Sequence, residues 1–226
     1  KIKSEIKNID LIYAANTVSH IKDLNSVFSS INYVLSNDGV LIIEDPSLLK
    51  CFKNVSYDQF YNEHIYIFSL IAIKNLIKKY NLEVFNIEKL TTHGGSLRYY
   101  IKRNSNKKLR VSSKVKIQLN QEMKFGLNKF TTYIKFKKNV ENSKKKLRAI
   151  FLRLKKQNKK IIGYGSTAKV CTILTYCKIK SENLEYFFDT TPNKVGKYMP
   201  GSHIYVRKYN KPLTNEADYV FLGAWN

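Results

Sequence analysis

Cysteine is scarce in this sequence, since a chain of 226 residues contains only Cys51, Cys171 and Cys177. No two of them have the Cys-x-x-Cys spacing, which excludes a disulfide scaffold and a complete thiolate zinc site built by this chain alone. We therefore predict three reduced, buried thiols of the kind found in cytosolic proteins.

Arginine is scarce as well. The chain has 34 Lys but only 6 Arg, beside 22 Asn, and its formal net charge is +23. Such a charge is typical of nucleic-acid-binding proteins, but arginine is the residue that reads phosphate and guanine through paired hydrogen bonds. Because Lys and Asn are spread over all segments, we interpret the charge as a compositional bias and expect no specific nucleic-acid partner.

Long hydrophobic runs and a signal peptide are absent. The longest apolar run, from Ile65 to Ile73, is too short to cross a membrane and is interrupted by Ser69, so no membrane association is expected. The chain begins with Lys rather than Met and ends within an apolar, strand-like run, 219–226. We therefore expect it to be part of a longer cytosolic protein.

Enough apolar material is present for a folded core, at 43% hydrophobic and 13% aromatic residues. The first hundred residues alternate between strand and helix patterns. Predicted strands are 9–15, 40–45, 82–90 and 96–102, predicted helices are 21–35 and 69–80 with Ser69 as N-cap, and Asn37-Asp38-Gly39 is a predicted turn. This order predicts an α/β fold whose mostly parallel sheet has an antiparallel edge.

The pattern becomes helical from about residue 104 to 158. Apolar residues recur at helical spacing, Lys is frequent, and Gly126 is the only glycine there. This predicts either one long helix or two helices with a solvated, lysine-rich face. A second α/β unit begins at 159, where Lys160–Lys169 has the pattern of a strand, a glycine turn and a helix start, and further strands are predicted at 184–188 and 219–222.

The densest group of polar and aromatic residues follows the second predicted strand. It contains Tyr61, Glu63 and His64 within four positions. Loops beyond the carboxyl ends of strands hold ligands in open α/β sheets. A histidine beside a carboxylate is suited to act as a general base, and a tyrosine can donate a hydrogen bond to a developing oxyanion. The same residues could also form an ordinary surface turn.

Three other positions are candidates for ligand binding. Asn16 and His20 follow the first strand, although Asn16 could instead cap the next helix. His93 precedes two glycines that allow a close backbone approach to a ligand or simply mark a turn. The turn Gly163–Lys169 could bind a phosphate through helix N-terminal amides, with Lys169 as a point charge. It has neither the P-loop spacing nor the third glycine of the dinucleotide motif.

Together these segments resemble the S-adenosylmethionine-dependent sugar C-methyltransferases, a family that methylates a carbon of a nucleotide-linked keto-deoxysugar. The matching segments are Asn16-Thr-Val-Ser-His20, Asp38-Gly-Val-Leu-Ile-Ile-Glu44, Phe60-Tyr-Asn-Glu-His-Ile-Tyr-Ile-Phe-Ser69, His93-Gly-Gly-Ser-Leu-Arg98, Gly163 to Lys169, Phe188-Asp-Thr-Thr-Pro192 and Gly201-Ser-His203. They occur in the order of the family and cover nearly the whole chain.

The resemblance implies an enzyme of three parts: a zinc-binding module, a methyltransferase domain, and a second α/β domain that closes over the sugar nucleotide. Residues 1–103 would be the second half of a class I, Rossmann-like methyltransferase sheet. Residues 104–158 would be a helical connector, and 159–226 a C-terminal Rossmann-like α/β domain truncated at its end. Zinc and most contacts to S-adenosylmethionine are expected upstream, so the chain alone is expected to be inactive.

The resemblance also implies roles for the candidate residues. His64 would be the general base that removes the proton next to the keto group, Glu63 would orient it or contact sugar hydroxyls, and Tyr61 would hold the sugar or the enolate oxygen. The residues implied to bind substrate are Asn16, His20, His93 and Lys169, and those implied to border the cofactor are Ala15 and Asn16.

Two other functions are compatible with these residues. One is methyl transfer to oxygen or nitrogen of another small acceptor, which the position of the transferred methyl group would reveal. The other is a basic binding module without catalysis, which would bind an anionic polymer with a steep dependence on salt. The resemblance leaves the sugar nucleotide, the methylated carbon and the oligomeric state open.

Overall fold

The computed structural model describes residues 8–209 and 217–224, and the chain divides into two compact units. Unit 1 comprises Lys1–Ser56 and Asn62–Lys135, and unit 2 comprises Tyr57–Tyr61 and Phe136–Asn226. The segment Tyr57–Tyr61 therefore folds with unit 2, although both of its neighbours along the chain belong to unit 1.

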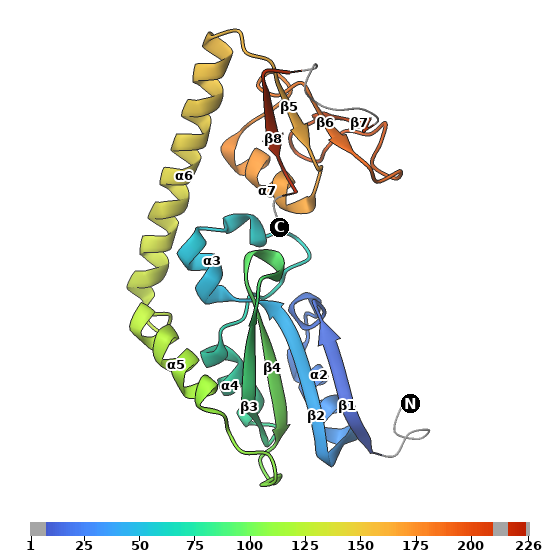
Figure 1. Ribbon diagram of the computed structural model, residues 1–226, viewed down its shortest axis with the longest axis vertical. Coiled ribbons are helices and arrows are strands. Elements are labelled where there is room, and N and C mark those ends of the chain that lie inside the picture. The colour runs from blue at the N-terminus through green and yellow to red at the C-terminus, as the bar shows by residue number, and fades with distance from the viewer. Residues whose placement is uncertain (1–7, 210–216, 225–226) are drawn as a thin grey trace. The chain divides into compact units, whose positions relative to one another are not determined.

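Unit 1 is built on a mixed sheet. Its strands in the described residues are β1 (Ile9–Ala15), β2 (Leu35–Pro46), β3 (Leu82–Leu90) and β4 (Ser96–Arg103), in the spatial order β1-β2-β4-β3 (Figure 1). β1 and β2 are parallel, whereas β4 runs antiparallel to both of its neighbours. The predicted α/β sheet with an antiparallel pair at one edge is confirmed.

Helices connect and cover these strands. They are α2 (Leu24–Val34), α3 (Leu48–Asn54), α4 (Leu70–Lys78) and α5 (Ser113–Phe125), with the short 3₁₀ turns η1 (Val18–His20) and η3 (Thr92–Gly94). α2 begins after Asp23, whose carboxylate accepts from the Ser26 amide at 3.0 Å. α4 begins after Ser69, whose hydroxyl accepts from the Ala72 amide at 3.1 Å. The N-cap predicted at Ser69 is confirmed.

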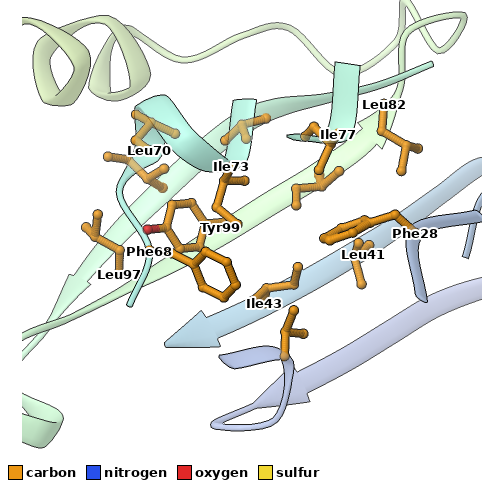
Figure 2. Packing of buried hydrophobic residues seen from close by; sticks show 14 of the residues in the cluster. Phe28, Leu41, Ile43, Phe68, Leu70, Ile73, Ile77, Leu82, Leu97 and Tyr99 are labelled. Atoms are coloured by element: carbon orange, nitrogen blue, oxygen red, sulfur yellow. The ribbon is translucent and has the colours of Figure 1, made fainter. Parts of the chain in front are cut away.

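The core of unit 1 lies on one face of the sheet (Figure 2). Alternation along β2 directs Leu41 and Ile43 to this face, where they meet Phe28 of α2 and Ile73 of α4. Tyr99 of β4 lies in the same cluster, and all five side chains are 0% exposed. Burial contributes about 1.5–3 kcal/mol for each large apolar side chain. The carboxyl ends of β1 and β2 are therefore supported by a firmly packed layer.

The turn predicted at residues 37–39 is wrong, because these residues lie inside β2. The ladder with β1 shifts its register between Ile9 and Leu11, so β2 carries extra residues opposite this point. Gly39 permits the irregularity, since a Cβ atom there would lie 2.8 Å from the Ile9 carbonyl oxygen.

The helical stretch after β4 consists of two helices, α5 and α6 (Phe130–Lys156), which confirms the second of the two alternatives. Gly126 ends α5 with a φ of +89°, a left-handed conformation that favours glycine. α6 begins in unit 1 and continues in unit 2. No helix in the described part of the chain, α6 included, is both long and apolar enough to cross a membrane.

A buried carboxylate joins α5 to α4. The side chain of Glu122 is 0% exposed and accepts from the amides of Leu70 and Ile71, both at 3.0 Å. The side-chain amide of Gln118 also donates to the Glu122 carboxylate, at 3.0 Å. A charge-assisted bond of this kind at a helix N-terminus satisfies amides that have no partner within the helix. Glu122 thus holds the start of α4 in place.

Unit 2 is built on a parallel sheet. Its described strands are β5 (Ile161–Tyr164), β6 (Tyr186–Asp189), β7 (Tyr205–Lys208) and β8 (Tyr219–Leu222), in the order β7-β6-β5-β8, accompanied by α7 (Ala168–Cys177) and the 3₁₀ turn η2 (Tyr57–Gln59) (Figure 1). Three of these strands match predicted ones. β7 was not predicted, because Val206 is its only buried residue and four residues carry too little pattern.

Candidate functional site

The carboxyl ends of β1 and β2 lie side by side, since Ala15 pairs with Glu44. Directly after β1, the Asn16 amide donates to the Glu44 carbonyl at 2.7 Å, and Asn16 adopts a φ of +50°. Asparagine is among the few residues that tolerate this left-handed conformation. The chain therefore turns sharply into η1 at the end of the sheet.

Asn16 and His93 are brought together. The side-chain amide of Asn16 donates to Nε2 of His93, which comes from η3, 77 positions later in the chain. The η3 turn is attached to the end of β2, because the Ser47 amide donates to the Gly95 carbonyl at 3.0 Å. Gly95 has a φ of +123°, so the glycine pair after His93 is required by the backbone.

His20 and His64 also meet at this end of the sheet. Their ring centroids lie 5.1 Å apart with an angle of 74° between the planes, which is an edge-to-face contact. The segment that carries His64 is attached to η1, because the Tyr66 amide donates to the Ser19 carbonyl at 3.1 Å. His64 is only 8% exposed. A charge on one ring is therefore poorly screened from the other.

The two neighbours of His64 in the predicted site have different surroundings. Glu63 is exposed in unit 1, whereas Tyr61 is half-buried and belongs to unit 2. Tyr61 belongs to the segment Tyr57–Tyr61, which contacts α7 of unit 2 at its first residue. There the Tyr57 hydroxyl lies 3.4 Å from the Cys177 thiol. Burial raises the pKa of Tyr57, and so does this contact with Cys177.

Asp45 belongs to this end of the sheet and was not predicted. Its side chain is 0% exposed at the carboxyl end of β2. Burial raises the pKa of Asp45 to about 6, against opposing effects of the Ser19 hydroxyl and amide and of His20, while Glu44 adds to the rise. Strand alternation could have revealed it, since every second residue before it is buried.

Several buried polar atoms at this end of the sheet have no hydrogen-bond partner in the described part of the chain. They are Oδ1 of Asn16, Oγ of Ser19, Nε2 of His20 and both carboxylate oxygens of Asp45. Ser19 is close enough to lower the pKa of Asp45 without completing a hydrogen bond of normal geometry. An unsatisfied buried group costs about 1–3 kcal/mol, so these atoms are suited to bind water or a polar ligand.

Glu44 has the opposite environment to its neighbour Asp45. It pairs with Arg98 at 3.0 Å on the other face of the sheet, and Arg98 also pairs with Glu88 at 3.0 Å. These partly exposed pairs contribute little to stability, but they fix the strand that follows η3. Residues 8–209 and 217–224 contain no group of three His, Cys, Asp or Glu side chains that could hold a metal ion.

In unit 2, the glycine turn after β5 is bound by a carboxylate of the protein. Asp189 accepts from the Ser166 amide at 2.8 Å, from its hydroxyl at 2.6 Å and from the Thr191 amide at 2.8 Å. Burial would raise the pKa of Asp189, but the hydrogen bonds outweigh it and hold that pKa well below its usual range. Asp189 thus occupies the Ser166 amide, which a phosphate would otherwise contact.

Lys169 lies inside unit 2 and is 8% exposed. Burial lowers its pKa, and Asp58 of η2 opposes this effect. A separate cavity of about 320 Å³ lies beside the turn, and its lining includes Ser166, Cys171, Lys194 and Lys197. The predicted substrate contact of Lys169 stays a prediction.

Two family models match the chain. A methyltransferase domain matches residues 2–87, and a C-methyltransferase C-terminal domain matches residues 91–226. The chain is 28% identical over 216 residues to the C-methyltransferase NovU of Streptomyces niveus. This alignment covers 96% of the chain and 51% of the relative, so the chain spans about half the length of that protein.

A solved structure is similar over a smaller part. It is an S-adenosylmethionine-dependent methyltransferase from Clostridium acetobutylicum ATCC 824, with 14% sequence identity and a TM-score of 0.33. The match covers 43% of the chain and 59% of that structure.

Proposed function

The chain belongs to the family defined by the C-methyltransferase C-terminal domain, and on this premise we propose that the protein carrying it methylates a carbon atom of a nucleotide-diphosphate-linked keto-deoxysugar, with S-adenosylmethionine as methyl donor. The observation that carries the proposal is the contact of half-buried His20 with buried His64 at the carboxyl end of the parallel pair β1–β2. Ligands bind at this edge in open α/β sheets.

His64 is the general base of the proposed reaction. Carbon becomes a nucleophile only after it loses a proton, and the proton next to a keto group is the acidic one. An imidazole is suited to take it because histidine titrates near neutral pH. The proton moves to a ring nitrogen of His64, and the electron pair of the broken C–H bond forms the enolate that then accepts the methyl group.

Ala15 and Asn16 are the residues of this chain proposed to border the cofactor. The Ala15 side chain is exposed at the end of β1, and Oδ1 of Asn16 is a buried acceptor without a partner in the described residues. A buried acceptor fits a ligand that carries amino and hydroxyl groups. S-adenosylmethionine, when bound, supplies an electrophilic methyl group, and these residues orient it.

Several residues of the chain are proposed to bind the substrate. Asn16, His20 and His93 would face the sugar, because they gather at the end of β1. Glu63 and Tyr61 would contact sugar hydroxyls or the enolate oxygen. Lys169 would act on the substrate from unit 2 through its charge.

We further propose three functional regions: residues 1–103 for the cofactor, 104–158 as a helical connector, and 159–226 for the substrate. The connector serves both units, since α5 packs on α4 in unit 1. Phe151 and Leu154 of α6 pack into the core of unit 2.

The test is the substitution His64→Asn in the full-length protein. The panel of substrates comprises thymidine- and uridine-diphosphate-linked keto-deoxyhexoses, with cofactor that carries a ¹³C methyl group. We expect turnover to fall by about 10²–10⁴-fold, the usual contribution of a positioned base, and the label to appear on carbon in the product NMR spectrum. His203→Asn, at an exposed histidine of unit 2, is the matched control.

Label on oxygen or nitrogen would replace the proposal with the alternative acceptor class. Unchanged turnover of His64→Asn would remove His64 from the role of base. An unfolding temperature equal to that of the wild type would confirm that the loss of turnover is chemical.

A further inference from the structure

Asp45 is a buried carboxylate that no Lys or Arg of the described residues neutralises. In the described part of the chain, no Lys or Arg forms an ion pair with it, although the chain has 40 such residues. Its side chain is 0% exposed, whereas Glu44 beside it is paired with Arg98. An uncompensated buried carboxylate destabilises a fold, so packing does not account for it.

The groups around Asp45 point to the two histidines. Ser19 and His20 act on it from η1, Glu44 acts from its own strand, and its charge reaches Tyr99 on β4. His20 is the one basic side chain among these groups. His20 in turn contacts His64 edge to face. The carboxylate of Asp45 therefore acts on one member of an imidazole pair whose rings are in direct contact.

We propose that Asp45 is a positioning residue whose negative charge compensates the positive charge that the pair His20–His64 gains when His64 takes the proton from the substrate. The inference rests on the proposed function. His64 is 8% exposed, so water screens the new charge poorly, and a fixed anion nearby lowers the energy of the charged state.

The step is balanced without any other reagent. The C–H bond of the substrate breaks, the proton goes to His64, and the electron pair stays on the substrate as the enolate. Asp45 remains a carboxylate throughout. The other charged groups here are Glu44, which acts on Asp45, Glu63, which precedes His64 in the chain, and Glu122, which acts on Tyr99 from α5.

The test isolates proton removal from methyl transfer. The full-length protein is incubated in D₂O with the panel of thymidine- and uridine-diphosphate-linked keto-deoxyhexoses, without methyl donor, and NMR follows exchange of the proton next to the keto group. Asp45→Asn keeps the shape of the side chain and removes its charge. We expect exchange to slow by at least about tenfold, with KM changed by less than about threefold. Asp38→Asn, an exposed aspartate on the same strand, should exchange at the wild-type rate.

Exchange by Asp45→Asn at the wild-type rate would overturn the inference while leaving the proposed function intact. If the wild-type protein shows neither exchange nor methylation, the proposed function fails, and the inference fails with it. Asp45→Asn should also unfold at a higher temperature than the wild type at pH 8. A lower unfolding temperature would identify Asp45 as a structural group and overturn the inference independently of activity.

Discussion

Replacing Asp45 by asparagine is expected to stabilise unit 1 at pH 8 and to change its stability little at pH 4. The folded protein raises the pKa of Asp45 from 3.8 to about 6, mainly through burial. A carboxyl whose pKa is raised on folding binds its proton more tightly in the native state. Stability therefore falls as the pH rises from about 4 to about 6, and the loss persists above that range.

The magnitude follows from the two pKa values. The rise from 3.8 to about 6 corresponds to roughly 3 kcal/mol at pH 8, because one pKa unit is worth 1.36 kcal/mol. At pH 4 the same relation leaves only about 0.5 kcal/mol. The side chain is 0% exposed, so water screens its charge only weakly. The stabilising effect of Asp45→Asn should thus increase by about 2–3 kcal/mol between pH 4 and pH 8.

Urea titration of wild type and variant at the two pH values measures this difference. Hydrogen exchange of the β4 amides then assigns the unfolding transition to unit 1. Comparing the pH 8 and pH 4 effects cancels any constant packing change caused by the amide. Asp38→Asn, at an exposed position on the same strand, is the control and should show a much smaller pH dependence. An effect of Asp45→Asn that is equal at both pH values would refute the reasoning.

Two further substitutions test the packing that supports the site. Glu122→Ala leaves the buried amides of Leu70 and Ile71 without their acceptor, which should cost about 3 kcal/mol; an unfolding free energy within experimental error of the wild type would contradict this. Gly163→Ala places a methyl group 2.4 Å from the Phe187 ring, and such overpacking should cost about 1–3 kcal/mol. Calorimetry should show a lower unfolding temperature for this variant than for the wild type, and an unchanged temperature would contradict the close contact.

The spacing of apolar residues along the chain was sufficient to predict most of the helices and strands. β1 and β3 match their predicted bounds, because each has a clear apolar pattern with polar residues at both ends. The turn at residues 37–39 was wrong for a reason of tertiary structure. The segment Asn37-Asp38-Gly39 is compatible with a turn and also with a bulged strand. Only its pairing with β1 selects the bulged strand.

For the candidate site, the sequence could indicate which residue types are involved, but not that they lie close together in space. Asn16 and His93 are 77 positions apart, and their contact depends on the order β1-β2-β4-β3. The contact of His20 with His64 depends on the hydrogen bond between the Tyr66 amide and the Ser19 carbonyl. Neither relation has a local signature. The resemblance to a family supplied these residues, and the structure adds the distances between them.

Asp45 shows why charge has to be assessed position by position. The chain carries a net charge of +23, yet no Lys or Arg of the described residues pairs with this carboxylate. Exposed lysines are screened by salt over about 10 Å, whereas charges in the interior interact strongly at short range. The net charge can therefore attract a diphosphate from solution without neutralising Asp45. In the proposed reaction, its negative charge would be available to the imidazole pair when a proton arrives on His64.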